Sequence, residues 1–108
     1  MKNNHEAIFC IVNKGYTDLV MESAKASGAT GGTVLSGRGT GTSDAAQFFG
    51  VTVTPEKEIV MIIVPTKIRD AVLTSINAGA GMDTKGMGIA FSLPISDILG
   101  LPTSGDNE

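Results

Sequence analysis

Two glycine-rich stretches contain the residues of this chain that are best suited to bind an anion. They cover residues 36–43 and 79–88, and they combine glycine with hydroxyl groups, with Arg38 in the first and Lys85 in the second. Glycine allows backbone N–H groups to approach an anion closely, and consecutive N–H groups can surround one. Neither stretch has the spacing of a P-loop or of a dinucleotide-binding turn. The two stretches together predict a phosphate site, while plain flexible turns would have the same composition.

The remaining reactive side chains do not assemble into the active site of an enzyme. His5 is the only histidine, so neither a metal centre nor a Ser-His-Asp triad is supported, and we expect its side chain to be solvated. Cys10 lies within an apolar run and is expected to be a buried thiol. No carboxylates have the spacing of an acid–base pair, so we expect solvated side chains at Asp18, Glu22, Asp70 and Asp83.

The strands that would position the glycine-rich stretches follow from the hydrophobic pattern. Continuous apolar runs at residues 7–12 and 58–65 predict two buried strands. Shorter runs at residues 33–36 and 89–93 predict two weaker strands. We expect the longer strands to lie in the centre of one sheet and the shorter ones at its edges.

Apolar residues at helical spacing predict one helix after the first strand and one after the third. The first helix is expected to end at Gly28, and Thr66 is expected to cap the second, which ends at Gly79 and Gly81. A further short helical turn is expected at residues 96–99. The order β-α-β-β-α-β predicts an α+β ferredoxin-like sandwich, in which two helices cover one face of a four-stranded antiparallel sheet.

A long connection, residues 39–55, separates the second and third strands. It contains Phe48 and Phe49, an aromatic pair that we expect to be exposed. Exposed apolar pairs are often docking elements for a partner protein, although this pair could also fold back on the domain. The polar tail, residues 102–108, is expected to be disordered, so residues 1–101 form the single domain.

The composition excludes several classes of protein. A formal net charge of −3 argues against nucleic-acid binding. No apolar run approaches the roughly 18 residues of a membrane span, and no secretion signal is recognised, so we expect a cytoplasmic protein. Both faces of the central strands look apolar, and two helices cover only one face. Self-association is therefore expected on the other face.

Four segments together resemble the PII signal-transduction family, also called nitrogen regulatory protein PII. Residues 28–34 resemble the family's helix-to-strand junction, and residues 39–41 resemble the Gly-x-Gly at the entry to its long T-loop. Residues 62–65 resemble the strand that leads into the second helix, and residues 84–91 resemble the B-loop with the fourth strand. The resemblance covers nearly the whole chain, and it rests on the order and spacing of these segments.

The resemblance implies a homotrimeric regulatory protein rather than an enzyme. A small effector, with AMP, ADP and ATP as candidates, would bind between subunits, between the Gly39 region of one chain and the Gly86 region of a neighbour. Binding would alter the T-loop, residues 39–55, which would dock on a partner such as a membrane transport protein. The implied ligand-binding residues are Thr33, Arg38, Gly39, Thr40, Gly41, Ile63, Lys85, Gly86, Met87 and Gly88.

The chain departs from typical family members at charged positions. Its T-loop is short and lacks a tyrosine, Met61 replaces a carboxylate, and no arginine follows the fourth strand. Each lost charge-assisted hydrogen bond is worth about 1.5–3 kcal/mol. We therefore expect AMP, ADP or another small metabolite rather than tightly bound ATP, and no sensing of 2-oxoglutarate. Two alternatives share the fold: a CutA-like trimeric protein of metal or stress response, and an acylphosphatase-like hydrolase that uses Arg38.

Overall fold

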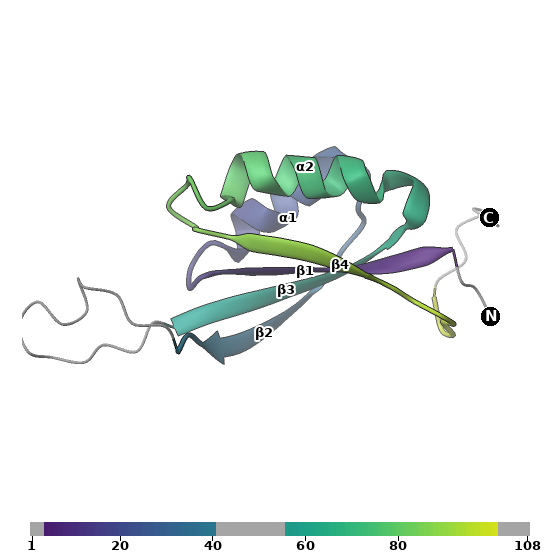
Figure 1. Cartoon of the computed structure of the whole chain (residues 1–108), viewed down its shortest axis with the longest axis horizontal. Coiled ribbons are helices and arrows are strands. Elements are labelled where there is room, and N and C mark those ends of the chain that lie inside the picture. The colour runs from purple at the N-terminus through teal and green to yellow at the C-terminus, as the bar shows by residue number, and fades with distance from the viewer. Residues whose placement is uncertain (1–3, 41–55, 102–108) are drawn as a thin grey trace, which may run out of the picture.

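The computed structural model describes residues 4–40 and 56–101, which form one four-stranded sheet covered by two helices (Figure 1). The strands pair antiparallel in the order β2-β3-β1-β4, so the two longest lie in the centre. Both helices lie on one face of the sheet. The predicted ferredoxin-like fold is confirmed. The elements are β1 (His5–Asn13), α1 (Thr17–Ala26), β2 (Thr33–Arg38), β3 (Glu56–Pro65), the 3-10 helix η2 (Thr66–Ile68), α2 (Arg69–Ala80) and β4 (Ile89–Pro94).

The core lies between the sheet and the helices. Alternate residues of each central strand are fully buried, because successive side chains of a strand point to opposite faces. The helices contribute residues four apart, as the predicted helical stripes require. Cys10 is part of this core, as predicted, and burial raises the pKa of its thiol to about 11. The core side chains from the strands are Ile8, Cys10, Val12, Val60, Ile62 and Val64, and those from the helices are Val20, Ala24, Val72, Ile76 and Ala80.

Among the predictions about helix ends, the one for Thr66 is wrong, whereas those for Gly28 and for Gly81, which is the C-cap of α2, are confirmed. Gly28 follows α1 with a φ of 110°, the left-handed conformation expected after a helix. Thr66 begins the 3-10 turn η2 instead of capping α2, which starts at Arg69 with Ile68 in the N-cap position. The N–H of Thr66 donates to the carbonyl of Asn4 at 2.9 Å. This bond holds Thr66 beside the start of β1, and α2 begins three residues later.

The short helical turn expected at residues 96–99 is also absent, and this part of the chain has a bend at Ser96 and a β-bridge at Ile98 instead. The N–H of Ile95 donates to the carbonyl of His5 at 3.2 Å, so contact with β1 continues one residue beyond the end of β4.

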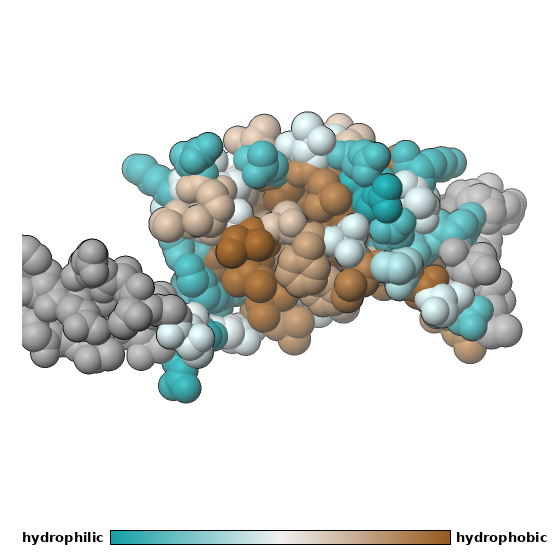
Figure 2. All heavy atoms as spheres, in the orientation of Figure 1, coloured by the Kyte–Doolittle hydropathy of each residue, from teal (hydrophilic) through white to brown (hydrophobic). Residues whose placement is uncertain are grey.

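The face of the sheet opposite the helices is apolar across all four strands, as the sequence indicated. Phe9 in β1 stands opposite Met61 in β3 and Phe91 in β4, and the two phenylalanine rings stack with centroids 5.5 Å apart. Leu35 is 47% exposed and Phe91 is 42% exposed. Figure 2 shows hydrophobic side chains gathered over the middle of the molecule on the side of β4, below the hydrophilic outer surface of the helices. We call this surface the open face; its apolar residues are Ala7, Phe9, Ile11, Leu35, Ile59, Met61, Ile63, Ile89, Phe91 and Leu93.

Candidate ligand-binding site

A cavity of about 680 Å³ lies at the end of the sheet where β2 begins and β3 ends. Thr33 and Ile63, two of the predicted ligand residues, line it together. Most of the cavity wall is apolar and only a few polar groups line it. This composition is usual for pockets that bind small molecules. The lining residues are His5, Gly28, Ala29, Thr30, Gly31, Gly32, Thr33, Met61, Ile63, Val64, Pro65, Lys67, Ile68 and Leu101.

The connection from α1 to β2, residues 28–32, forms one wall of this cavity. A Cβ atom at Gly32 would lie 3.0 Å from the carbonyl oxygen of Met61 and 3.1 Å from Sδ of Met21. Glycine at this position therefore lets the connection lie directly against β3. From the sequence, residues 28–32 were identified only as a junction between elements. Their composition does not show that they line a cavity together with residues of β3 and with Leu101.

His5 lies in the wall of the same cavity, and its predicted solvation is wrong. Only 3% of its surface is exposed; it begins β1 opposite Pro65 of β3, and its carbonyl accepts a hydrogen bond from the N–H of Ile95. Leu101, from the chain that follows β4, lines the same cavity. Nδ1 of His5 has no hydrogen-bond partner within residues 4–40 and 56–101. The four carboxylates expected at the surface, Asp18, Glu22, Asp70 and Asp83, are exposed as predicted.

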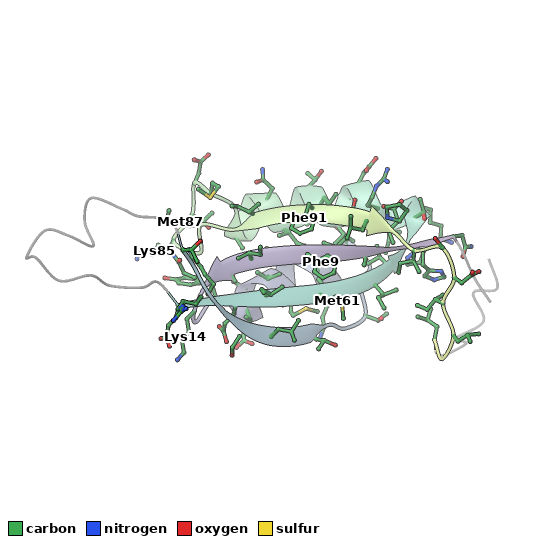
Figure 3. All side chains as sticks on the ribbon, turned by 60° about the horizontal axis from the view of Figure 1, so that its bottom comes forward. Phe9, Lys14, Met61, Lys85, Met87 and Phe91 are labelled. Carbon is green, nitrogen blue, oxygen red and sulfur yellow. The ribbon has the colours of Figure 1, made fainter. Side chains whose placement is uncertain are left out.

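The other end of the sheet brings together most of the remaining predicted ligand residues. Arg38, at the end of β2, pairs with Glu56 at the start of β3. The N–H of Lys14 donates to the carbonyl of Glu56 at 3.3 Å, and the N–H of Asn13 donates to the carbonyl of Gly86 at 2.9 Å. These bonds place the glycine loop, residues 81–88, at the same end as Arg38. Figure 3 shows Lys14, Lys85 and Met87 together at this end, away from Met61.

The glycine loop uses several of its own N–H groups. Thr84 N–H donates to the carbonyl of Gly81 at 2.9 Å, Met87 N–H to that of Thr84 at 3.0 Å, and Gly88 N–H to that of Ala80 at 2.7 Å. These three groups are therefore not open to an anion. The N–H groups of Met82, Asp83, Lys85 and Gly86 have no partner among the described residues.

The described ligand residues thus form two groups at opposite ends of one sheet. Ile63 lies seven residues from Glu56 along β3, which corresponds to about 23 Å. Thr33 and Ile63 belong to the cavity end. Arg38, Gly39, Thr40 and the loop residues Lys85, Gly86, Met87 and Gly88 belong to the other end, which we call the basic end together with Lys14 and Lys57. Gly41, Phe48 and Phe49 lie outside the described residues.

Gly39 and Gly86 both lie at the basic end of one chain. The expected contact between the Gly39 region of one chain and the Gly86 region of a neighbour involves two chains, and it stays a prediction. Within residues 4–40 and 56–101, no three His, Cys, Asp or Glu side chains gather in a way that could hold a metal ion.

Comparison with known proteins settles the family. The sequence profile described as "Nitrogen regulatory protein P-II" matches residues 5–104. The chain belongs to this family. It also resembles a solved structure, that of Arabidopsis thaliana PII bound to citrate, with 25% sequence identity and a TM-score of 0.70. The match covers 97% of this chain and 89% of the plant chain. No curated protein sequence matches at a significant level.

Family and fold together identify a PII-like regulatory signalling protein. The profile match includes the residues of both the cavity end and the basic end, so both ends belong to the domain that the family shares. In the part of the chain that the structure describes, the helices are too short and too polar for any of them to span a bilayer.

Proposed function

We propose that this chain binds an adenine nucleotide in clefts between the subunits of a homotrimer. In each cleft, the cavity end of one chain holds the base, and the basic end of the next chain contacts the phosphates. The observation that carries the proposal is the separation of the two groups of ligand residues. One small effector cannot reach both ends of a single sheet, whereas a ring of head-to-tail contacts brings unlike ends of neighbouring copies together.

The open face supports the trimer. It is apolar on every strand, and the helices leave it uncovered. A contiguous apolar surface of this kind usually marks an interface. Burying it between copies would also fix the relative position of their sheet ends, so the assembly and the ligand site depend on the same contacts.

The charges of the basic end favour a ligand with few phosphate groups. Arg38 and Lys85 are exposed cations there, and the chain has no lysine or arginine beyond Lys85. AMP or ADP is therefore a better match than ATP, because each further phosphate adds negative charge without a matching cation. The plant relative was solved with citrate, so a small carboxylate is a second ligand to include in binding experiments.

The regulatory output would pass through residues 39–55, which leave the sheet at the basic end. In this proposal a bound nucleotide shifts the conformations of that segment, and Phe48 and Phe49 then contact a partner protein. A membrane transport protein is the partner we propose from the family resemblance, with the chain itself acting in the cytoplasm. The protein regulates its partner and catalyses no reaction.

Calorimetric titration with AMP, ADP, ATP and citrate tests this proposal. We expect ADP to bind the wild-type trimer, and Lys85→Met to weaken binding by about tenfold or more, because a charge-assisted hydrogen bond is lost. Lys25→Met is the matched control, since Lys25 is an exposed lysine in the last turn of α1. A wild-type protein that binds none of the three nucleotides would contradict the proposal.

A further inference from the structure

Asn13, the last residue of β1, joins two segments that are far apart in the sequence. Its main-chain N–H donates to the carbonyl of Gly86 at 2.9 Å, and its side-chain Nδ2 donates to the carbonyl of Lys85 at 3.1 Å. Its Oδ1 accepts a hydrogen bond of 2.7 Å from Nζ of Lys57, the second residue of β3. One amide side chain therefore connects the glycine loop with β3.

The chemistry of these partners fixes the orientation of the Asn13 amide. A lysine ammonium group only donates hydrogen bonds, so Oδ1 must face Lys57. A main-chain carbonyl only accepts them, so Nδ2 must face Lys85. If the amide turned over, both bonds would be lost at once. Lys57 thus holds the Asn13 side chain in the one orientation that can bond to the glycine loop.

The bond to Lys85 sets the direction of one N–H group in the glycine loop. The peptide unit between Lys85 and Gly86 is trans and planar, so its C=O and N–H groups point in opposite directions. With the carbonyl held by Asn13, the N–H of Gly86 points to the other side of the loop.

This N–H group is the part of the glycine loop that most needs an outside acceptor. Gly86 is a buried residue, and its N–H has no partner among the described residues, whereas the N–H groups of Thr84 and Met87 are bonded within the loop and that of Gly88 to the carbonyl of Ala80. A main-chain N–H of a buried residue is usually paired with protein, water or a ligand. A ligand oxygen would satisfy it.

We propose that Asn13 is a positioning residue of the ligand site, which orients the N–H of Gly86 toward a phosphate oxygen of the bound nucleotide. Asn13 itself does not touch the ligand. The inference rests on the proposed function, and it adds a residue that neither the glycine pattern nor the distribution of charge in the sequence indicates.

Asn13→Asp is the sharpest test because it keeps the size of the side chain. A carboxylate accepts but does not donate, so the bond to the carbonyl of Lys85 is lost. We expect calorimetry to show about ten- to hundredfold weaker binding of ADP. Adenosine, which has no phosphate group, should bind as it does to the wild type. Lys25→Met is the control, because it removes an exposed cation of α1 that lies outside the basic end and makes no bond to Asn13.

Nuclear magnetic resonance of the wild-type trimer gives a second measurement that does not depend on a variant. The amide resonance of Gly86 should move on addition of ADP and stay in place on addition of adenosine. A Gly86 resonance that ADP leaves unmoved, or equal loss of ADP and adenosine binding in Asn13→Asp, would overturn the inference while the proposed function stood. Failure of the wild type to bind any adenine nucleotide would overturn the proposed function instead.

Discussion

Replacing Phe91 by glutamate would place a charge in the middle of the open face. Phe91 stacks on Phe9 and lies on β4, with 42% of its surface exposed in the single chain. In the proposed trimer that exposed part is covered by a neighbouring copy. We therefore expect Phe91→Glu to leave the chain folded and to prevent the trimer from forming.

The size of the effect follows from the exposed area. An aromatic side chain offers about 150–250 Å² for burial, so the exposed part of Phe91 amounts to roughly 80 Å². At about 25 cal/mol per Å² its burial contributes about 2 kcal/mol per chain, or about 6 kcal/mol per trimer. Burying an unpaired carboxylate in its place adds a penalty of several kcal/mol. Together these terms are large enough to dissociate a trimer at micromolar concentration.

Sedimentation velocity over a range of protein concentrations is the assay. The wild type should sediment as a trimer and Phe91→Glu as a monomer with an unchanged circular dichroism spectrum. Ala78→Glu is the control, because Ala78 is exposed on α2, in the layer that covers the opposite face. The monomeric variant should also lose ADP binding. The reasoning is refuted if Phe91→Glu remains a trimer or if the wild type is a monomer.

Two further predictions concern the packing of the domain. Gly88→Ala should lower the free energy of unfolding by about 1–3 kcal/mol in urea denaturation, because its Cβ would overlap the carbonyl oxygen of Ala80. Gly31→Ala is the control, since there is open space around its Cβ, and an equal loss of stability in both variants would contradict this reasoning. The pKa of Cys10 rises from 9.0 to about 11 on folding. The unfolded thiol therefore ionises first, so stability should fall by up to about 3 kcal/mol between pH 9 and 11, and Cys10→Ala should lack this component of the fall.

The sequence predicted the fold because the strands follow a simple hydrophobic rule. The apolar runs around Cys10 and Ile62 are long and continuous, which distinguishes central strands from the shorter edge strands. The cap of α2 was placed at Thr66, two residues before Ile68, which holds that position. The bond from Thr66 to Asn4 is a contact between distant parts of the chain, and local capping rules contain no information about it.

The candidate site was predicted only in part, for a similar reason. Composition identified Arg38 and Lys85 as cations, but it could not tell that they lie at the opposite end of the sheet from Thr33. His5 was expected in water because histidine near a chain end is usually exposed, yet it is buried in the wall of the cavity. Asn13 gave no signal at all, since its role depends on three partners from distant segments.

The glycine loop shows why composition alone could not separate binding from packing. Gly88 is required by the fold, because a Cβ there would overlap the carbonyl oxygen of Ala80 and lie 2.9 Å from Cγ1 of Val12. At Gly86 a Cβ would lie no closer than 3.4 Å to its neighbours, so packing alone does not demand glycine there. Among the glycines of the loop, Gly86 is thus the one least required by packing, and its N–H has no partner among the described residues. Packing explains Gly88, whereas the proposed phosphate contact would explain Gly86.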